Sequence, residues 1–248
     1  MNLSKHKVLV TGGGSGIGLE IAREFVTRGN QVAICGRDSK KLKLAQSSIG
    51  AQAAIRCDLA EPYAIPKLVA DTSRSLGGLS ILVNNAGIQY NYNLLEKNPN
   101  EVFLDAAEEI QVNFTSLVAL TAACIPALSE NPQAAVVNIS SGLAIAPKAS
   151  APVYCATKAA VHSFSRSLRY QCEDSMPHLR VFEVFPPLVE TDMTKGRGDG
   201  KISPGDVAAE VFRGLSNDRY EIRVGKVKYL DFINRIFPTL AAKLVKES

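Results

Sequence analysis

Short apolar runs alternate with longer segments of helical periodicity along most of the chain. Several runs are continuous in Val, Ile and Leu, which is typical of strands buried on both faces of a parallel sheet. The predicted strands are Lys7–Thr11, Gln31–Cys35, Ala53–Cys57, Ser80–Val83, Ala135–Ile139 and Val181–Phe185. Helical periodicity covers Gly16–Thr27, Lys40–Ser48, Tyr63–Leu76, Asn100–Leu128 and Tyr154–Cys172. This order predicts an α/β fold, a doubly wound parallel sheet with helices on both faces.

The chain shows no internal linker, repeat or low-complexity tract, so its 248 residues predict a single domain over 1–248. The segment Thr191–Ser203 differs in composition from the rest of the chain, because three glycines stand among charged residues. We expect a mobile substrate loop there.

A glycine-rich turn, Thr11–Gly18, follows the first predicted strand directly. Glycine lets the backbone turn tightly and approach a pyrophosphate, while the next helix offers free N–H groups and its positive dipole end. The turn therefore predicts a Rossmann-type dinucleotide site. Its candidate residues are Gly12, Ser15, Gly16, Ile17 and Gly18.

The end of the second predicted strand bears on the choice of dinucleotide. An acidic residue at this tip would bind a ribose diol and select NAD, but Gly36 stands there and Arg37 follows. Because a guanidinium can bind a 2′-phosphate in a bidentate manner, NADP(H) is favoured and NAD(H) stays possible. Asp38 could serve the ribose or cap the next helix. Asp58, after the third strand, could likewise accept from an adenine amine or cap a helix.

Tyr154 and Lys158 stand four residues apart on a predicted helix, so their side chains share one face. A positive charge beside a phenol favours phenolate and lowers its pKa. The pair therefore predicts proton exchange with a carbonyl or alcohol oxygen.

Charge and cysteine content exclude several classes of function. The net charge is only +4 and no run of five Lys or Arg occurs, so we expect no nucleic-acid partner. Five scattered cysteines indicate a reducing compartment, the cytoplasm. Metal-ligand spacing is lacking, so we predict no metal, and no run of 18 apolar residues predicts a membrane span. Glu108 and Glu109 are interpreted as a solvated helix face.

In order and spacing, Thr11–Gly18, Asn84–Gly87, Asn113, Ser141 and the Tyr154/Lys158 pair resemble the short-chain dehydrogenase/reductase superfamily, in its single-domain type of about 250 residues. More closely, the chain is similar to the DltE-like oxidoreductases, through stretches that include Ser141–Ala144, Val153–Phe164 and Pro186–Thr191.

The resemblance implies catalytic roles. Tyr154 would be the general acid in reduction and the base in oxidation. Lys158 would hold the nicotinamide ribose and lower the pKa of the tyrosine. Ser141 would hydrogen-bond the substrate oxygen, and Asn113 would bind a water that relays protons between Lys158 and solvent.

The resemblance also implies the rest of the cofactor site. The residues that would contact the dinucleotide here are Asp58, Leu59, Asn85, Ala86, Gly87, Pro186, Val189 and Thr191, together with Tyr154 and Lys158. Two positions depart from the family pattern: Pro187 replaces the usual glycine after Pro186, and Ser15 replaces the basic residue that many NADP users carry.

The segment 226–248 predicts an amphipathic helical tail, with Leu230, Ile233 and Phe237 at helical spacing and several lysines between. We expect the tail to pack near the cleft or on a partner subunit, and contact with an anionic membrane is the alternative.

The sequence thus predicts an NADP(H)-dependent oxidoreductase that interconverts a small carbonyl compound and an alcohol. The resemblance implies a homodimer or homotetramer. Two alternatives stay open: an NAD-dependent alcohol dehydrogenase on the same site, and a dinucleotide-binding regulatory protein with little turnover. The substrate is not identified.

Overall fold

Seven parallel strands form one sheet in the order β3-β2-β1-β4-β5-β6-β7. The structure is a computed structural model that describes residues 1–61 and 63–246. The strands are β1 (Lys7–Thr11), β2 (Gln31–Gly36), β3 (Ala53–Arg56), β4 (Ile81–Asn84), β5 (Ala134–Ile139), β6 (Leu179–Phe185) and β7 (Glu221–Arg223). The predicted doubly wound sheet is confirmed, and the order reverses between β1 and β4, where such sheets bind ligands.

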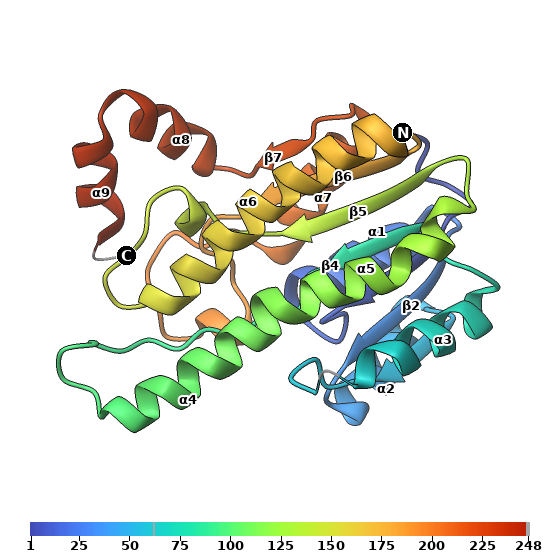
Figure 1. Ribbon diagram of the computed structural model, residues 1–248, viewed down its shortest axis with the longest axis horizontal. Helices are drawn as coiled ribbons and strands as arrows, with labels where there is room; N and C mark the ends of the chain where they lie inside the picture. Colours follow the sequence, from blue (N-terminus) through green and yellow to red (C-terminus); the bar gives the residue numbers. More distant parts are fainter. Residues whose placement is uncertain (62, 247–248) are drawn as a thin grey trace.

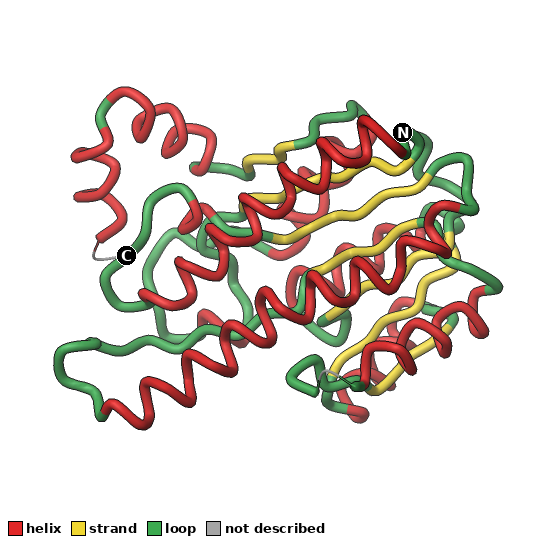
Figure 2. The backbone as a smooth tube through the Cα atoms, in the orientation of Figure 1, coloured by secondary structure: helices red, strands yellow, loops and turns green. Residues whose placement is uncertain are grey.

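Helices cover both faces of the sheet (Figures 1 and 2). Their bounds are α1 (Gly16–Thr27), α2 (Ser39–Ile49), α3 (Ala64–Leu76), α4 (Pro99–Ile110), α5 (Ser116–Ser129), α6 (Pro152–Ser175), α7 (Pro204–Ser216), α8 (Val227–Ile236) and α9 (Pro238–Lys246). One core cluster joins the sheet to α1, α2 and α7, and a second joins it to α3, α5 and α6. The continuous apolar strands therefore bury both of their faces.

The helix predicted over Asn100–Leu128 is one long rod, in which a π-helical turn at Gln111–Thr115 joins α4 to α5. By length and composition this rod, Pro99–Ser129, could cross a membrane, which the sequence reading did not expect. Its apolar character has a local cause, because the inner face of α5 packs on the sheet through residues such as Leu120 and Leu128.

Strand β7 and helix α7 were not predicted from the sequence. Strand β7 is only three residues long, too short for a periodicity argument. Helix α7 begins after Ser203, whose hydroxyl accepts from the Asp206 N–H while the Asp206 carboxylate accepts from the Ser203 N–H. This capping box gives the segment after the predicted loop a defined start.

The tail forms a hairpin of α8 and α9 rather than one helix, and it stands at one end of the molecule (Figure 1). The chain turns at Phe237, before Pro238, because proline cannot continue the hydrogen bonding of α8. Leu230 and Ile233 face inward, whereas Phe237, Leu240 and Leu244 are exposed. The inner face packs on Leu143 and Ala146, so the tail lies against the segment that follows Ser141. Residues 247 and 248 of the predicted tail lie outside the described part of the chain.

Candidate active site

The glycine-rich turn has the geometry that a phosphate group needs. Gly12 has φ +63°, and a Cβ built on Gly18 would lie 2.5 Å from the Gly12 carbonyl oxygen. Helix α1 begins at Gly16 after Ser15, which makes no side-chain cap bond, and its first turn carries no acidic residue. The first N–H groups of α1 are therefore available to an anion, and the residues present fit a dinucleotide pyrophosphate.

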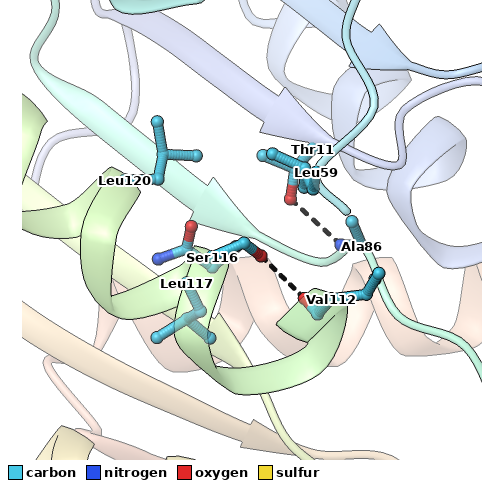
Figure 3. Close-up of a pocket in the computed structure, with 8 residues that line it drawn as sticks. Thr11, Leu59, Ala86, Val112, Ser116, Leu117 and Leu120 are labelled. Carbon is cyan, nitrogen blue, oxygen red and sulfur yellow. Dashed lines mark hydrogen bonds between the residues drawn. The ribbon is translucent and has the colours of Figure 1, made fainter. Parts of the chain in front are cut away.

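The segment after β4 is tied to this turn by Thr11. The Thr11 hydroxyl accepts from the backbone N–H of Asn85 at 2.9 Å and of Ala86 at 3.0 Å. The Asn85 amide donates to the Thr11 carbonyl at 2.9 Å. Thr11, Ala86 and the buried Leu59 surround a cavity of about 10 Å³ beside α5, room for about one water (Figure 3).

The segment after β6 lies over the same edge of the sheet. A Cβ on Gly16 would be 3.0 Å from the Thr191 methyl carbon, so Thr191 covers the glycine turn. Val189 forms an isolated bridge with Ile202, which closes the base of the 191–203 loop. The Pro186 carbonyl accepts from the Gly142 N–H at 3.0 Å and so joins this segment to the residue after Ser141.

Tyr154 and Lys158 lie in the first two turns of α6, and both are buried. The Lys158 ammonium is 5.7 Å from the centre of the Tyr154 ring and donates to the Ile139 carbonyl at 2.8 Å. The Ser141 side chain interacts with the Tyr154 phenol and lowers its pKa. The three predicted catalytic side chains are thus brought together.

The predicted lowering of the Tyr154 pKa is wrong for this structure. Burial raises the pKa of Tyr154 to about 12, and the hydrogen bond with Ser141 only partly opposes that rise. Burial also lowers the pKa of Lys158 to about 8, against the charge of Glu183. A spacing of four residues indicates the charge beside the phenol but not how far the phenol is desolvated.

Asn113 lies in the π-helical turn and is buried. Its side chain accepts from the Ile88 N–H at 2.8 Å, and donates to the Ile88 carbonyl at 2.9 Å and the Thr157 hydroxyl at 3.2 Å. Asn113 therefore fixes the chain after Gly87 to α6. A Cβ on Gly87 would lie 3.7 Å from the Lys158 ammonium.

The residues at the outer end of the predicted cofactor site are more exposed than Tyr154 and Lys158. Arg37 is exposed, and its guanidinium lies 3.8 Å from a Glu108 oxygen. The Asp38 carboxylate accepts from the N–H groups of Lys40 and Lys41, so the interpretation of Asp38 as the cap of α2 is confirmed. Asp58 does not cap α3, because its carboxylate accepts from the Ala60 N–H in a turn before that helix.

Glu109, which the sequence placed on a solvated helix face, is one of the charged groups that act on Tyr154. Glu109 is fully buried rather than solvated, and its carboxylate accepts from the Tyr90 N–H at 2.9 Å. Lys148 is buried, and the charge of Arg197 acts on both Lys148 and the phenol.

This arrangement, with a phosphate-binding turn and a Tyr–Lys–Ser cluster along one sheet edge, defines a dehydrogenase or reductase of the Rossmann type. The chain belongs to the short-chain dehydrogenases, whose family model matches residues 6–201.

Known relatives agree with this assignment. The chain is 39% identical over 220 residues to "Uncharacterized oxidoreductase DltE" of Bacillus subtilis, covering 89% of this chain and 83% of the relative. It is 31% identical to "Dehydrogenase/reductase SDR family member 7B" of Rattus norvegicus, covering 94% of this chain and 75% of that protein.

Solved structures share the fold. A short-chain dehydrogenase from Burkholderia cenocepacia in complex with NADP has a TM-score of 0.80 and 26% identity, covering 90% of this chain and 98% of its own. One from Burkholderia phymatum in complex with NAD has a TM-score of 0.86 at 21% identity, covering 97% and 96%. The predicted family and fold are confirmed.

Proposed function

We propose that this protein is an NADP(H)-dependent oxidoreductase that interconverts a carbonyl compound and an alcohol, with Tyr154 as the acid and base. The observation that carries the proposal is the position of the Lys158 ammonium, 5.7 Å from the centre of the buried Tyr154 ring, with Ser141 acting on the same phenol. A bound nicotinamide supplies or accepts the hydride.

The side chains of the chain handle the substrate oxygen. In reduction, Tyr154 gives its proton to the carbonyl oxygen, which gains negative charge as its carbon takes the hydride. The Ser141 hydroxyl donates to the same oxygen and holds it against the phenol. Lys158 stabilises the phenolate that remains, which is the point at which its charge matters most.

The choice of NADP(H) rests on Arg37. Its side chain is 63% exposed next to the end of β2, and its contact with Glu108 is a loose one of 3.8 Å, which a 2′-phosphate could replace. Arg56 lies on the neighbouring strand and donates to the Arg37 carbonyl at 3.4 Å, which adds a second positive charge to this corner. The relatives include complexes with either dinucleotide, so the preference of this chain depends on its own residues.

Parallel measurements with NADPH and NADH on a panel of ketones and aldehydes test the proposal. Tyr154→Phe should lower turnover by orders of magnitude and leave cofactor affinity nearly unchanged. Tyr170→Phe, on the exposed side of the same helix, is the matched control and should keep full activity. Turnover by Tyr154→Phe at the wild-type rate would exclude the proposed acid. A wild-type protein that binds dinucleotide yet reduces nothing in the panel favours the regulatory alternative.

Arg37→Ala tests the cofactor preference separately. Loss of a charged hydrogen-bonding partner should weaken NADPH binding by about tenfold to a hundredfold and change NADH binding little. Arg74→Ala, an exposed arginine on α3, is the control. Equal losses for both dinucleotides would remove the phosphate assignment and leave the NAD-dependent alternative.

We also propose a homo-oligomer, in which the outer face of α4 contacts a second copy. Phe103, Leu104 and Ile110 are exposed along this face, a costly arrangement for an isolated chain in water. Light scattering on the purified protein should give a dimer or tetramer, and Phe103→Ser with Leu104→Ser should shift it toward monomer. An unchanged mass for the double variant would place the contact elsewhere.

A further inference from the structure

An ion pair between Lys41 and Asp192 joins two segments that lie 151 positions apart in the chain. Lys41 is in the first turn of α2, and Asp192 begins the short helical turn Asp192–Thr194 after β6. The Lys41 ammonium lies 2.8 Å from a carboxylate oxygen of Asp192. Both side chains are mostly exposed, at 56% and 74%, so the pair contributes little to stability. Its position therefore matters more than its strength.

The Lys41 end of the pair is anchored beside the end of β2. Leu42, the next residue, is buried. A Cβ built on Gly14 or on Gly36 would lie 3.6 Å from the same methyl carbon of Leu42, its Cδ2 atom. Gly36 is the last residue of β2, where dinucleotide-binding sheets hold the adenosine ribose. Lys41 therefore stands on the ribose side of the glycine-rich turn.

The Asp192 end of the pair is anchored on the same turn from the segment after β6. A Cβ built on Gly16 would lie 3.0 Å from the methyl carbon of Thr191, the residue before Asp192. One partner is thus held next to Gly14 and the other next to Gly16. The ion pair therefore lies across the turn that fits a dinucleotide pyrophosphate.

The glycine-rich turn brings no positive charge of its own to this place, because Thr11–Gly18 contains neither lysine nor arginine. The cations at this corner come from the chain after β2: Arg37, which is loosely paired with Glu108 at 3.8 Å, and Lys41. A phosphate group carries about two negative charges at pH 7, whereas the Asp192 carboxylate carries one. A phosphate on the ribose is therefore the stronger partner for the Lys41 ammonium.

We propose that Lys41 binds the 2′-phosphate of NADP(H) together with Arg37, and that Asp192 competes with this phosphate for the Lys41 ammonium. The inference rests on the proposed function and adds a second residue that selects the cofactor. When the ammonium turns to the phosphate, the Asp192 carboxylate is left to solvent, to which it is already largely exposed. Lys41 keeps its pair with Asp192 when the ribose carries no phosphate, as in NAD(H).

Neither side chain of the pair is needed for the local fold. The start of α2 is fixed by the Asp38 carboxylate, which accepts from the backbone N–H of Lys41 at 3.1 Å. The turn at Asp192 is held by the Lys201 ammonium, which donates to the Thr194 carbonyl at 2.7 Å. Lys41→Met and Asp192→Asn should therefore both fold, and their effects on binding should have opposite signs.

Calorimetric titration with NADP⁺ and with NAD⁺ tests these signs. Lys41→Met loses a charged partner of the phosphate, so its affinity for NADP⁺ should fall by about tenfold while its affinity for NAD⁺ changes little. Asp192→Asn loses the competitor, so it should bind NADP⁺ about twofold to fivefold more tightly than the wild type, with NAD⁺ unchanged. Lys43→Met and Asp199→Asn remove the same charges from exposed positions of α2 and of the 191–203 loop, and both should bind as the wild type does.

Two further measurements isolate the phosphate and the competition. Adenosine 2′,5′-bisphosphate and AMP differ only by the 2′-phosphate, and Lys41→Met should lower the ratio of their affinities by about tenfold. The double variant of Lys41→Met with Asp192→Asn should bind NADP⁺ as Lys41→Met does, because Asp192 acts only through the ammonium. Equal losses for NADP⁺ and NAD⁺ in Lys41→Met would assign the ammonium to the pyrophosphate and overturn the proposal. Weaker NADP⁺ binding in Asp192→Asn would also overturn it, because the ion pair would then close over the bound cofactor.

These titrations contain no substrate, so they separate this inference from the proposed function. If Arg37→Ala loses affinity for NADP⁺ while Lys41→Met binds both dinucleotides as the wild type does, the proposed function stands and Lys41 is excluded. If the wild type reduces no compound tested but Lys41→Met still loses affinity for NADP⁺ alone, the inference stands and the proposed function fails.

Discussion

Replacement of Glu109 by glutamine should make the protein more stable at neutral pH and leave it unchanged in acid. Burial raises the pKa of this carboxyl group from 4.5 to about 6, against one hydrogen bond from Tyr90. Its second oxygen is buried without a partner. Because the folded pKa lies above the unfolded one, the ionised side chain opposes folding, and that penalty is absent below about pH 4.5.

The size of the effect follows from the shift. One pKa unit corresponds to about 1.4 kcal/mol, so the charge costs about 1–2 kcal/mol above about pH 6. Glu109→Gln keeps an oxygen for the Tyr90 N–H and removes the charge. Its gain in unfolding free energy over wild type should therefore grow between about pH 4.5 and pH 6 and then stay constant.

Urea denaturation at a fixed protein concentration, followed by circular dichroism between about pH 4 and pH 8, measures this difference. Glu101→Gln, which removes an exposed acid from the same helix, is the control for the loss of one negative charge. A difference for Glu109→Gln that does not change with pH would refute the reasoning, since burial of a charge must depend on ionisation.

Three further predictions concern other parts of the molecule. Gly18→Ala would place a methyl group 2.5 Å from the Gly12 carbonyl oxygen, so the phosphate turn must shift. We expect the free energy of unfolding, measured by thermal denaturation, to fall by about 1–3 kcal/mol and dinucleotide binding to weaken. Unchanged binding would contradict the close packing. The hydrogen bond to the buried Glu183 raises the pKa of His162. The stability that this pair contributes is therefore complete below about pH 6.5 and is lost as pH rises through the folded pKa. His162→Asn should destabilise the protein more at about pH 6 than at about pH 9, and a loss that does not change with pH would show a packing effect only. The inward packing of α8 and α9 predicts that the full chain and a chain cut after Gly225 sediment equally little with anionic vesicles, and sedimentation of the full chain alone would establish the membrane alternative.

The sequence predicts the sheet well because its strands are buried on both faces. Continuous runs such as that in β1 and β4 leave little ambiguity, and the glycine turn fixes where the first helix begins. Short or two-part elements were harder to predict. Strand β7 has three residues, and the α8–α9 turn depends on one proline within an amphipathic pattern.

In the site, too, the features that depend on neighbouring residues were easier to predict than those that depend on residues far apart in the chain. The approach of Lys158 to Tyr154 follows from their helical spacing, and the closeness of Ser141 from strand order. Desolvation of the phenol depends on residues far apart in the chain, so the direction in which the Tyr154 pKa shifts could not be predicted from the Tyr–Lys spacing.

The packing of the tail on Leu143 and Ala146 has a consequence for the order in which the protein matures. The α8–α9 hairpin follows every strand of the sheet in the chain, so a ribosome delivers the nucleotide-binding half, the phenol and the lysine before the residues that support the segment after Ser141. The segment after Ser141 therefore gains this support only after all the strands of the described sheet have been made.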